Sequence, residues 1–172
     1  MKHIYILILA VCFVFTSGCS SSDSGSAKAN NDPELGEALE SYQTFLGNTL
    51  NDSTSLLDRY NALVDSLYVQ DVSADQLANS LKEIIKDSSE LVKHVDGHDY
   101  YHQNIQPYHR SLIGYINEQH QLFLDSIEMA NNDRVDKGEL RENYLIVKES
   151  QNNIINSWGT AAEPAEQQGK PF

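Results

Sequence analysis

The sequence predicts an all-α protein, an antiparallel bundle of about four helices. Between residues 33 and 158, apolar side chains recur in steps of three and four, the spacing of one helix face. No segment shows the sustained alternation of apolar and polar residues that is typical of a half-buried strand. The 172 residues include only 9 Gly and 4 Pro, which favours long helices over many short elements joined by turns.

The first predicted helix begins at Asp32-Pro33, where Asp suits the N-cap position and Pro the first helical position. Its apolar spacing continues to about residue 68, interrupted by the polar run at residues 51–54 (NDST). A continuous helix over residues 33–68 is about 54 Å long, well beyond the other predicted helices. The sequence leaves two alternatives open, which are one long helix with a polar patch and two helices that meet near residue 51.

Three further helices are predicted over about residues 73–95, 107–130 and 137–158. The first of these opens with Ser73 and Gln76 in the spacing of a capping box. Short polar connections make antiparallel neighbours the natural arrangement of the four helices. The residues expected to face one common core are Leu77, Leu81, Ile84, Leu91, Leu112, Tyr115, Leu122, Leu140, Tyr144, Val147 and Ile154.

Both flanks of this predicted domain have the composition of mobile chain. Residues 20–32 (SSSDSGSAKANND) contain no large apolar side chain, so residues 19–32 are interpreted as a flexible linker. The last residues (TAAEPAEQQGKPF) are small, polar and interrupted by Pro. We therefore expect the helical domain at residues 33–158 and a disordered tail at residues 159–172.

The N-terminus has the pattern of a secretion signal. Residues 4–15 (IYILILAVCFVF) form an apolar run of 12 residues, too short to cross a bilayer as a helix. The run ends in Thr16-Ser17-Gly18-Cys19, which places two small residues directly before a cysteine. The segment resembles the lipobox of bacterial lipoproteins, although Thr16 stands where that pattern usually has Leu. An ordinary signal peptide followed by a chance cysteine is the alternative interpretation.

The resemblance implies where the protein is located. Residues 1–18 would be removed as a signal peptide, and the thiol of Cys19 would receive diacylglycerol, giving a lipid anchor on the extracytoplasmic face of the cell membrane. The second cysteine, Cys12, lies within the apolar run, so the mature chain would have no pair with which to form a disulfide. We expect the membrane to be a partner through this anchor.

The charge of the chain restricts its other partners. It carries 12 Lys and Arg against 25 Asp and Glu, a formal net charge of −13. Binding to phosphate groups requires clustered cations, so we do not expect nucleic acid as a partner. A protein or another component of the cell envelope is the expected partner.

One segment carries an unusual set of side chains. Residues 94–109 (HVDGHDYYHQNIQPYH) combine histidines, tyrosines and carboxylates between two predicted helices. His98 and His102 would share a face if residues 99–103 were helical, and Asp99 would join them. Imidazole and carboxylate groups are ligands for Zn²⁺ or another divalent transition metal. The alternatives are a contact loop for a protein or glycan and a plain helix–helix connection.

The motifs of common enzymes are absent from the sequence. We find no G-x-S-x-G, S-x-x-K, H-E-x-x-H or P-loop pattern, and no E-x-x-H pair of di-iron bundles. The leading hypothesis is therefore a non-enzymatic, lipid-anchored helical binding module without a cofactor. The alternative is a lipoprotein that binds a metal or a small ligand through residues 94–109, and a hydrolase without a known motif ranks third.

Overall fold

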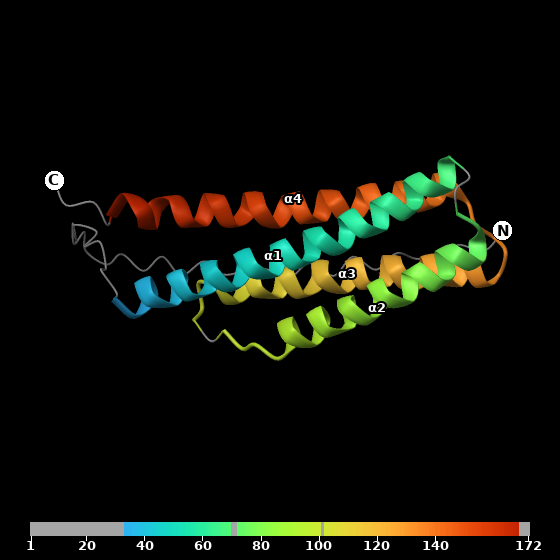
Figure 1. The fold of residues 1–172 in the computed structure, drawn as a ribbon. Coiled ribbons are helices and arrows are strands. Elements are labelled where there is room, and N and C mark those ends of the chain that lie inside the picture. The colour runs from blue at the N-terminus through green and yellow to red at the C-terminus, as the bar shows by residue number, and fades with distance from the viewer. Residues whose placement is uncertain (1–32, 70–71, 101, 169–172) are drawn as a thin grey trace, which may run out of the picture. The chain divides into compact units, whose positions relative to one another are not determined.

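The computed structural model describes residues 33–69, 72–100 and 102–168. Nearly all of this chain is helical, in α1 (Pro33–Tyr68), α2 (Ala74–Asp96), α3 (Gln106–Asn131) and α4 (Lys137–Gln168). Consecutive helices run in opposite directions (Figure 1). The prediction of an all-α, antiparallel four-helix bundle is confirmed. The predicted signal peptide, Cys19 and the linker lie outside the described residues.

The helices form a ring in which each packs against its two neighbours. α1 contacts α2 and α4, and α3 also contacts α2 and α4, with the α2–α3 pairing the most extensive. α1 and α3 touch only slightly. This arrangement gives each helix one inward face and leaves four lines along the surface where neighbouring helices meet.

The polar run near residue 51 does not interrupt α1, which is continuous over 36 residues. Ser53 is fully buried, and its hydroxyl hydrogen-bonds the hydroxyl of Tyr115 on α3. The Nε2 of Gln119 donates to the carbonyl oxygen of Ser53 at 2.8 Å, and the Nε2 of Gln151 donates to the Oγ1 of Thr54 at 2.9 Å. Of the two alternatives, one long helix is correct, because the polar side chains find partners on α3 and α4.

The helix ends follow the local sequence. The Oγ of Ser73 accepts a hydrogen bond from the backbone of Gln76, whose side chain accepts one from the Ser73 backbone, so the predicted capping box is confirmed. The Oδ1 of Asp136 accepts from two backbone N–H groups in the first turn of α4, at 2.8 and 3.1 Å. At the end of α3, Asp133 has a φ of 52°, the left-handed conformation that closes a Schellman motif.

α4 extends beyond the end that the sequence predicts. The expected boundary at residue 158 is wrong, because the helix continues to Gln168. The prediction of a disordered tail therefore fails for residues 159–168, whereas residues 169–172 lie outside the described part of the chain. The segment GTAAEPAEQQ is rich in Ala, Glu and Gln, which favour extension of a helix that has already formed upstream.

The predicted core stripes face the interior. Of the residues expected there, Tyr144 and Ile154 are partly buried and the others are buried. Tyr42, Leu57, Tyr60 and Val64 of α1 complete the same core, each fully inaccessible to solvent. Among the helices described, none is both long enough and apolar enough to cross a membrane.

Candidate functional site

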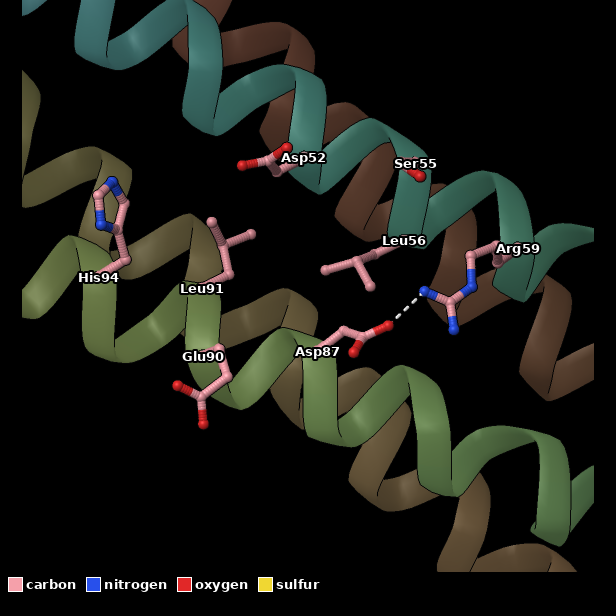
Figure 2. A pocket seen from close by; sticks show the side chains of 8 residues that line it. All are labelled: Asp52, Ser55, Leu56, Arg59, Asp87, Glu90, Leu91 and His94. Carbon is pink, nitrogen blue, oxygen red and sulfur yellow. Dashed lines mark hydrogen bonds and ion pairs between the residues drawn. The ribbon is translucent and has the colours of Figure 1, made fainter.

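One opening with an apolar floor lies between α1 and α2. It has a volume of about 400 Å³, at the lower end of the sizes usual for ligand pockets. Figure 2 shows Leu56 and Arg59 of α1 and Asp87 and Leu91 of α2 extending toward the space between the two helices. We call this site the α1–α2 groove, and it is lined by Asp52, Ser55, Leu56, Arg59, Asp87, Glu90, Leu91 and His94.

The floor of the α1–α2 groove is apolar. Leu56 from α1 and Leu91 from α2 are 5% and 6% exposed, so they belong to the outer layer of the core. Asp52 and Ser55 stand one turn apart on α1 and form part of the exposed wall above Leu56. The groove thus combines a narrow apolar strip with polar side chains along its rim (Figure 2).

The rim of the groove carries more negative than positive charge. Arg59 of α1 and Asp87 of α2 form an ion pair of 2.6 Å across it, and Glu90 pairs with Lys93 at 2.9 Å. The Arg59–Asp87 side chains are 44% and 48% exposed, so this pair adds little to stability. Within the described chain, the carboxylate of Asp52 forms no hydrogen bond or ion pair. It is therefore open to a cation from outside.

A second hollow lies between α3 and α4 and is more polar. Its volume is about 500 Å³, and an ion pair of 4.0 Å between Arg134 and Glu128 lies beside it. The residues that line it are Asp125, Glu128, Met129, Arg134, Asp136, Glu139 and Asn143. This hollow is also acidic, but Met129 is its only large apolar side chain.

The residues predicted to bind a metal are not brought onto one helix face. Residues 98–100 and 102 lie outside helices, so the condition under which His98 and His102 would share a helix face is not met. The cause is that α2 ends at Asp96, and α3 does not begin until Gln106. Among the residues that the structure describes, no three His, Cys, Asp or Glu side chains are arranged to hold a metal ion.

The two histidines of that set instead hydrogen-bond within the connection. The Nδ1 of His98 donates to the carbonyl oxygen of His94 at 2.7 Å, and the Nδ1 of His102 accepts from the backbone N–H of Asn104 at 3.3 Å. The ring of His98 also rests against Phe45 of α1, with the two centroids 4.6 Å apart. The metal site remains a prediction without support from this geometry.

The fourth histidine of the segment, His109, is the buried one. Its Nε2 donates to the carbonyl oxygen of His98 at 2.7 Å, which fastens the α2–α3 connection onto the first turn of α3. It lies within an aromatic cluster near the beginning of α1 and of α3, which we call the aromatic end. The members of the aromatic end are Tyr42, Phe45, Tyr100, His109 and Trp158.

The sequence analysis placed His109 in the segment but did not distinguish it from the three histidines that are not buried. The signal was its position, since His109 precedes Leu112 by three residues and Ile116 by seven, on the buried stripe of α3. The rings of Tyr42 and Trp158 meet edge to face with centroids 4.9 Å apart, and Tyr42 meets Tyr100 at 4.8 Å. Such pairs stabilise beyond their buried area, so the aromatic end is a packed cluster.

Several polar atoms of the aromatic end are buried without a partner in the described protein. They are the Oη of Tyr42, the Nδ1 of His109 and the Nε1 of Trp158. Burial raises the pKa of Tyr42 well above its ordinary value, and the electrostatic effect of the neighbouring Tyr100 raises it further. The hydroxyl therefore stays protonated at neutral pH, and this end of the bundle carries no phenolate charge.

One serine–histidine contact resembles the pairing of a nucleophile with a base. The Oγ of Ser88 on α2 lies 2.7 Å from the Nδ1 of His120 on α3, and burial lowers the pKa of His120. Ser88 is only 2% exposed and also donates to the carbonyl oxygen of Ile85 at 3.0 Å. It lies mid-helix, where the backbone N–H groups are already bonded and cannot stabilise an oxyanion. We interpret the contact as packing between α2 and α3.

Comparison with known proteins adds no family to these observations. No protein-family model matches the chain, and neither a curated protein nor a solved structure matches it significantly.

Proposed function

We propose that this protein is a lipid-anchored binding module without catalytic activity, held on the extracytoplasmic face of the cell membrane through Cys19. The observation that carries the proposal is the apolar run of residues 4–15 followed by Thr16-Ser17-Gly18-Cys19. This order of an apolar segment, small residues and cysteine is the pattern on which lipoprotein processing depends. The partner that we propose is a protein or another component of the cell envelope.

The geometry of the bundle supports a role in binding a partner and not in catalysis. The α1–α2 groove lies between two helices and has a floor of nearly buried leucines and an exposed, charged rim. In the described chain, its His94 has no serine, threonine or cysteine hydrogen-bonded to it, and such a pairing is what nucleophilic catalysis requires. A surface of this kind suits the docking of a partner's side chains.

The anchoring is tested by Cys19→Ser in the full chain, with Cys12→Ser as a matched control. Cys12 lies inside the apolar run, so its replacement keeps the processing site. We expect the Cys19→Ser chain to accumulate as an uncleaved precursor or to be released in soluble form, with no added acyl mass. The Cys12→Ser chain should be cut, acylated and recovered with membranes, like the parent.

Membrane fractionation and intact mass spectrometry measure both outcomes. If Cys19→Ser is still cut before residue 19 and still sediments with membranes, the lipid anchor is not on this residue and the proposal fails. Processing of both variants at another site would support an ordinary signal peptide and would also contradict the proposal.

A further inference from the structure

We infer that the α1–α2 groove binds a protein segment of the partner in which Lys or Arg side chains stand beside apolar ones. This inference rests on the proposed function and names the class of partner that the binding module would hold. It is carried by two independent features of the groove, its apolar floor and the charge of its rim.

The charge of the rim selects a cationic occupant. Asp52, Asp87 and Glu90 line the groove, and Arg59 is the one permanently positive side chain among the lining residues. Arg59 is already paired with Asp87, and Glu90 is paired with Lys93 outside the lining. Asp52 has no partner in the described chain, so an arriving ammonium or guanidinium group would gain an ion pair without breaking one. An anionic ligand would meet repulsion instead.

The floor of the groove selects a cation with an aliphatic stem. A lysine or arginine side chain lays its methylene groups along an apolar surface while its charged head reaches water or a carboxylate. Leu56 and Leu91 provide that surface between Asp52 of α1 and Asp87 of α2 (Figure 2). A small inorganic cation could use the carboxylates but not the leucines, and no three metal-binding side chains converge in the described residues.

The charge of the whole chain acts in the same direction. With a formal net charge of −13, the protein attracts cationic partners from a distance and raises their rate of encounter. The more polar α3–α4 hollow is acidic too, so long-range attraction alone does not choose between the two sites. The apolar floor distinguishes the α1–α2 groove from that more polar hollow, because it favours a partner in which apolar side chains flank the cation.

The direct test is a binding titration of the full chain in nanodiscs of neutral phosphatidylcholine. The probe is a fluorescent peptide that alternates Lys with Leu, and empty nanodiscs provide the background. Fluorescence anisotropy should show saturable binding that weakens as salt is added, because exposed ion pairs are screened. A peptide with Glu in place of Lys should not bind, and a peptide with Ser in place of Leu should bind at least several-fold more weakly.

Two pairs of variants locate the binding. Asp52→Asn removes the open carboxylate, and Asp58→Asn makes the same change on the side of α1 that faces Tyr144 of α4. An exposed ion pair contributes up to about 1 kcal/mol, so Asp52→Asn should weaken binding up to about fivefold, whereas Asp58→Asn should leave it within about twofold.

The second pair introduces a positive charge. Ser55 is exposed and forms no hydrogen bond in the described chain, so Ser55→Lys places a cation in the groove with little effect on folding. We expect it to weaken binding by about tenfold or more, because the new cation occupies the same floor and repels the probe. Asn153→Lys adds the same charge on an exposed position of α4 and should change binding little.

The results separate this inference from the proposed function. If the parent chain fails to bind the Lys/Leu peptide, or binds the Glu peptide equally well, the inference is wrong while the anchoring at Cys19 is unaffected. Equal losses in Asp52→Asn and Asp58→Asn would mean that net charge, not the groove, holds the probe, which also overturns the inference. Conversely, failure of the Cys19→Ser test leaves specific binding in the groove intact.

Discussion

The buried tyrosine hydroxyls differ in whether they have a partner, and this difference predicts opposite effects of their removal. The Oη of Tyr42 has none in the described chain, whereas the Oη of Tyr115 bonds the buried Ser53. Tyr42→Phe should leave the free energy of unfolding unchanged or raise it by up to about 1 kcal/mol, because no hydrogen bond is lost. Tyr115→Phe should lower it by about 1–3 kcal/mol, because the Ser53 hydroxyl loses its partner.

Urea unfolding followed by circular dichroism at neutral pH measures both variants of this pair. Each variant removes one oxygen and retains the aromatic ring, so differences in packing are small. A loss in Tyr42→Phe as large as that in Tyr115→Phe would contradict the assignment of Tyr42 as unpartnered.

His120 predicts a dependence of stability on mildly acidic pH. Burial lowers the pKa of His120 below its ordinary 6.5, so the unfolded chain binds a proton more readily than the folded one. Stability should therefore fall as the pH drops through about 6.5 and continue to fall until the folded-state pKa is passed. His120→Gln should have a flatter profile between about pH 7.5 and 5.5. Parallel profiles for the two proteins, measured by thermal unfolding, would show that His120 is not the group responsible.

At the scale of the elements, α2 should contribute to stability through its buried face and not through the connection that follows it. Leu81 is fully buried in the core, and Leu81→Ala should lower the free energy of unfolding by about 2–5 kcal/mol. The double variant His98→Ala/His102→Ala changes side chains outside the helices and should cost about 1 kcal/mol or less. Thermal unfolding with and without Zn²⁺ measures both effects.

Two outcomes of that experiment would change the interpretation. A silent Leu81→Ala would contradict the packing of α2 against its neighbours. A melting temperature that Zn²⁺ raises in the parent and not in the double histidine variant would establish a metal site at residues 98–102, which the present geometry does not support.

At the scale of the whole molecule, burial of three tyrosines predicts that the bundle unfolds at high pH. Burial raises the pKa of Tyr42, Tyr60 and Tyr115, that of Tyr60 to about 12. An acidic group with a raised folded-state pKa stabilises the fold fully below its unfolded pKa of about 10, and this stability is lost as the pH rises above 10. Near-ultraviolet titration should show these phenolates appearing only as the helical signal disappears. Ionisation of Tyr42, Tyr60 and Tyr115 near pH 10 in a folded chain would contradict the prediction.

The sequence by itself determined the helices, because helical structure depends on residues three and four positions apart. The spacing of Leu77, Leu81 and Ile84 identified a buried face of α2. Ser73 and Gln76 identified the residue at which this helix begins. The same local reasoning failed at residues 159–168, where a polar composition was interpreted as an end to helix formation. The predicted lipobox of residues 16–19 likewise depends only on contiguous residues, because a processing enzyme would recognise such a signal in one stretch of chain.

Only the tertiary structure decided which side chains meet, because contacts between helices depend on their register and on which faces they turn to each other. Ser53 and Tyr115 are 62 positions apart, and their contact explains why the polar run of α1 is buried and not a hinge. The α1–α2 groove likewise requires Asp52 and Leu56 to stand opposite Asp87 and Leu91. Periodicity along one helix carries no information about that pairing, which is set by how the buried faces of all four helices fit together.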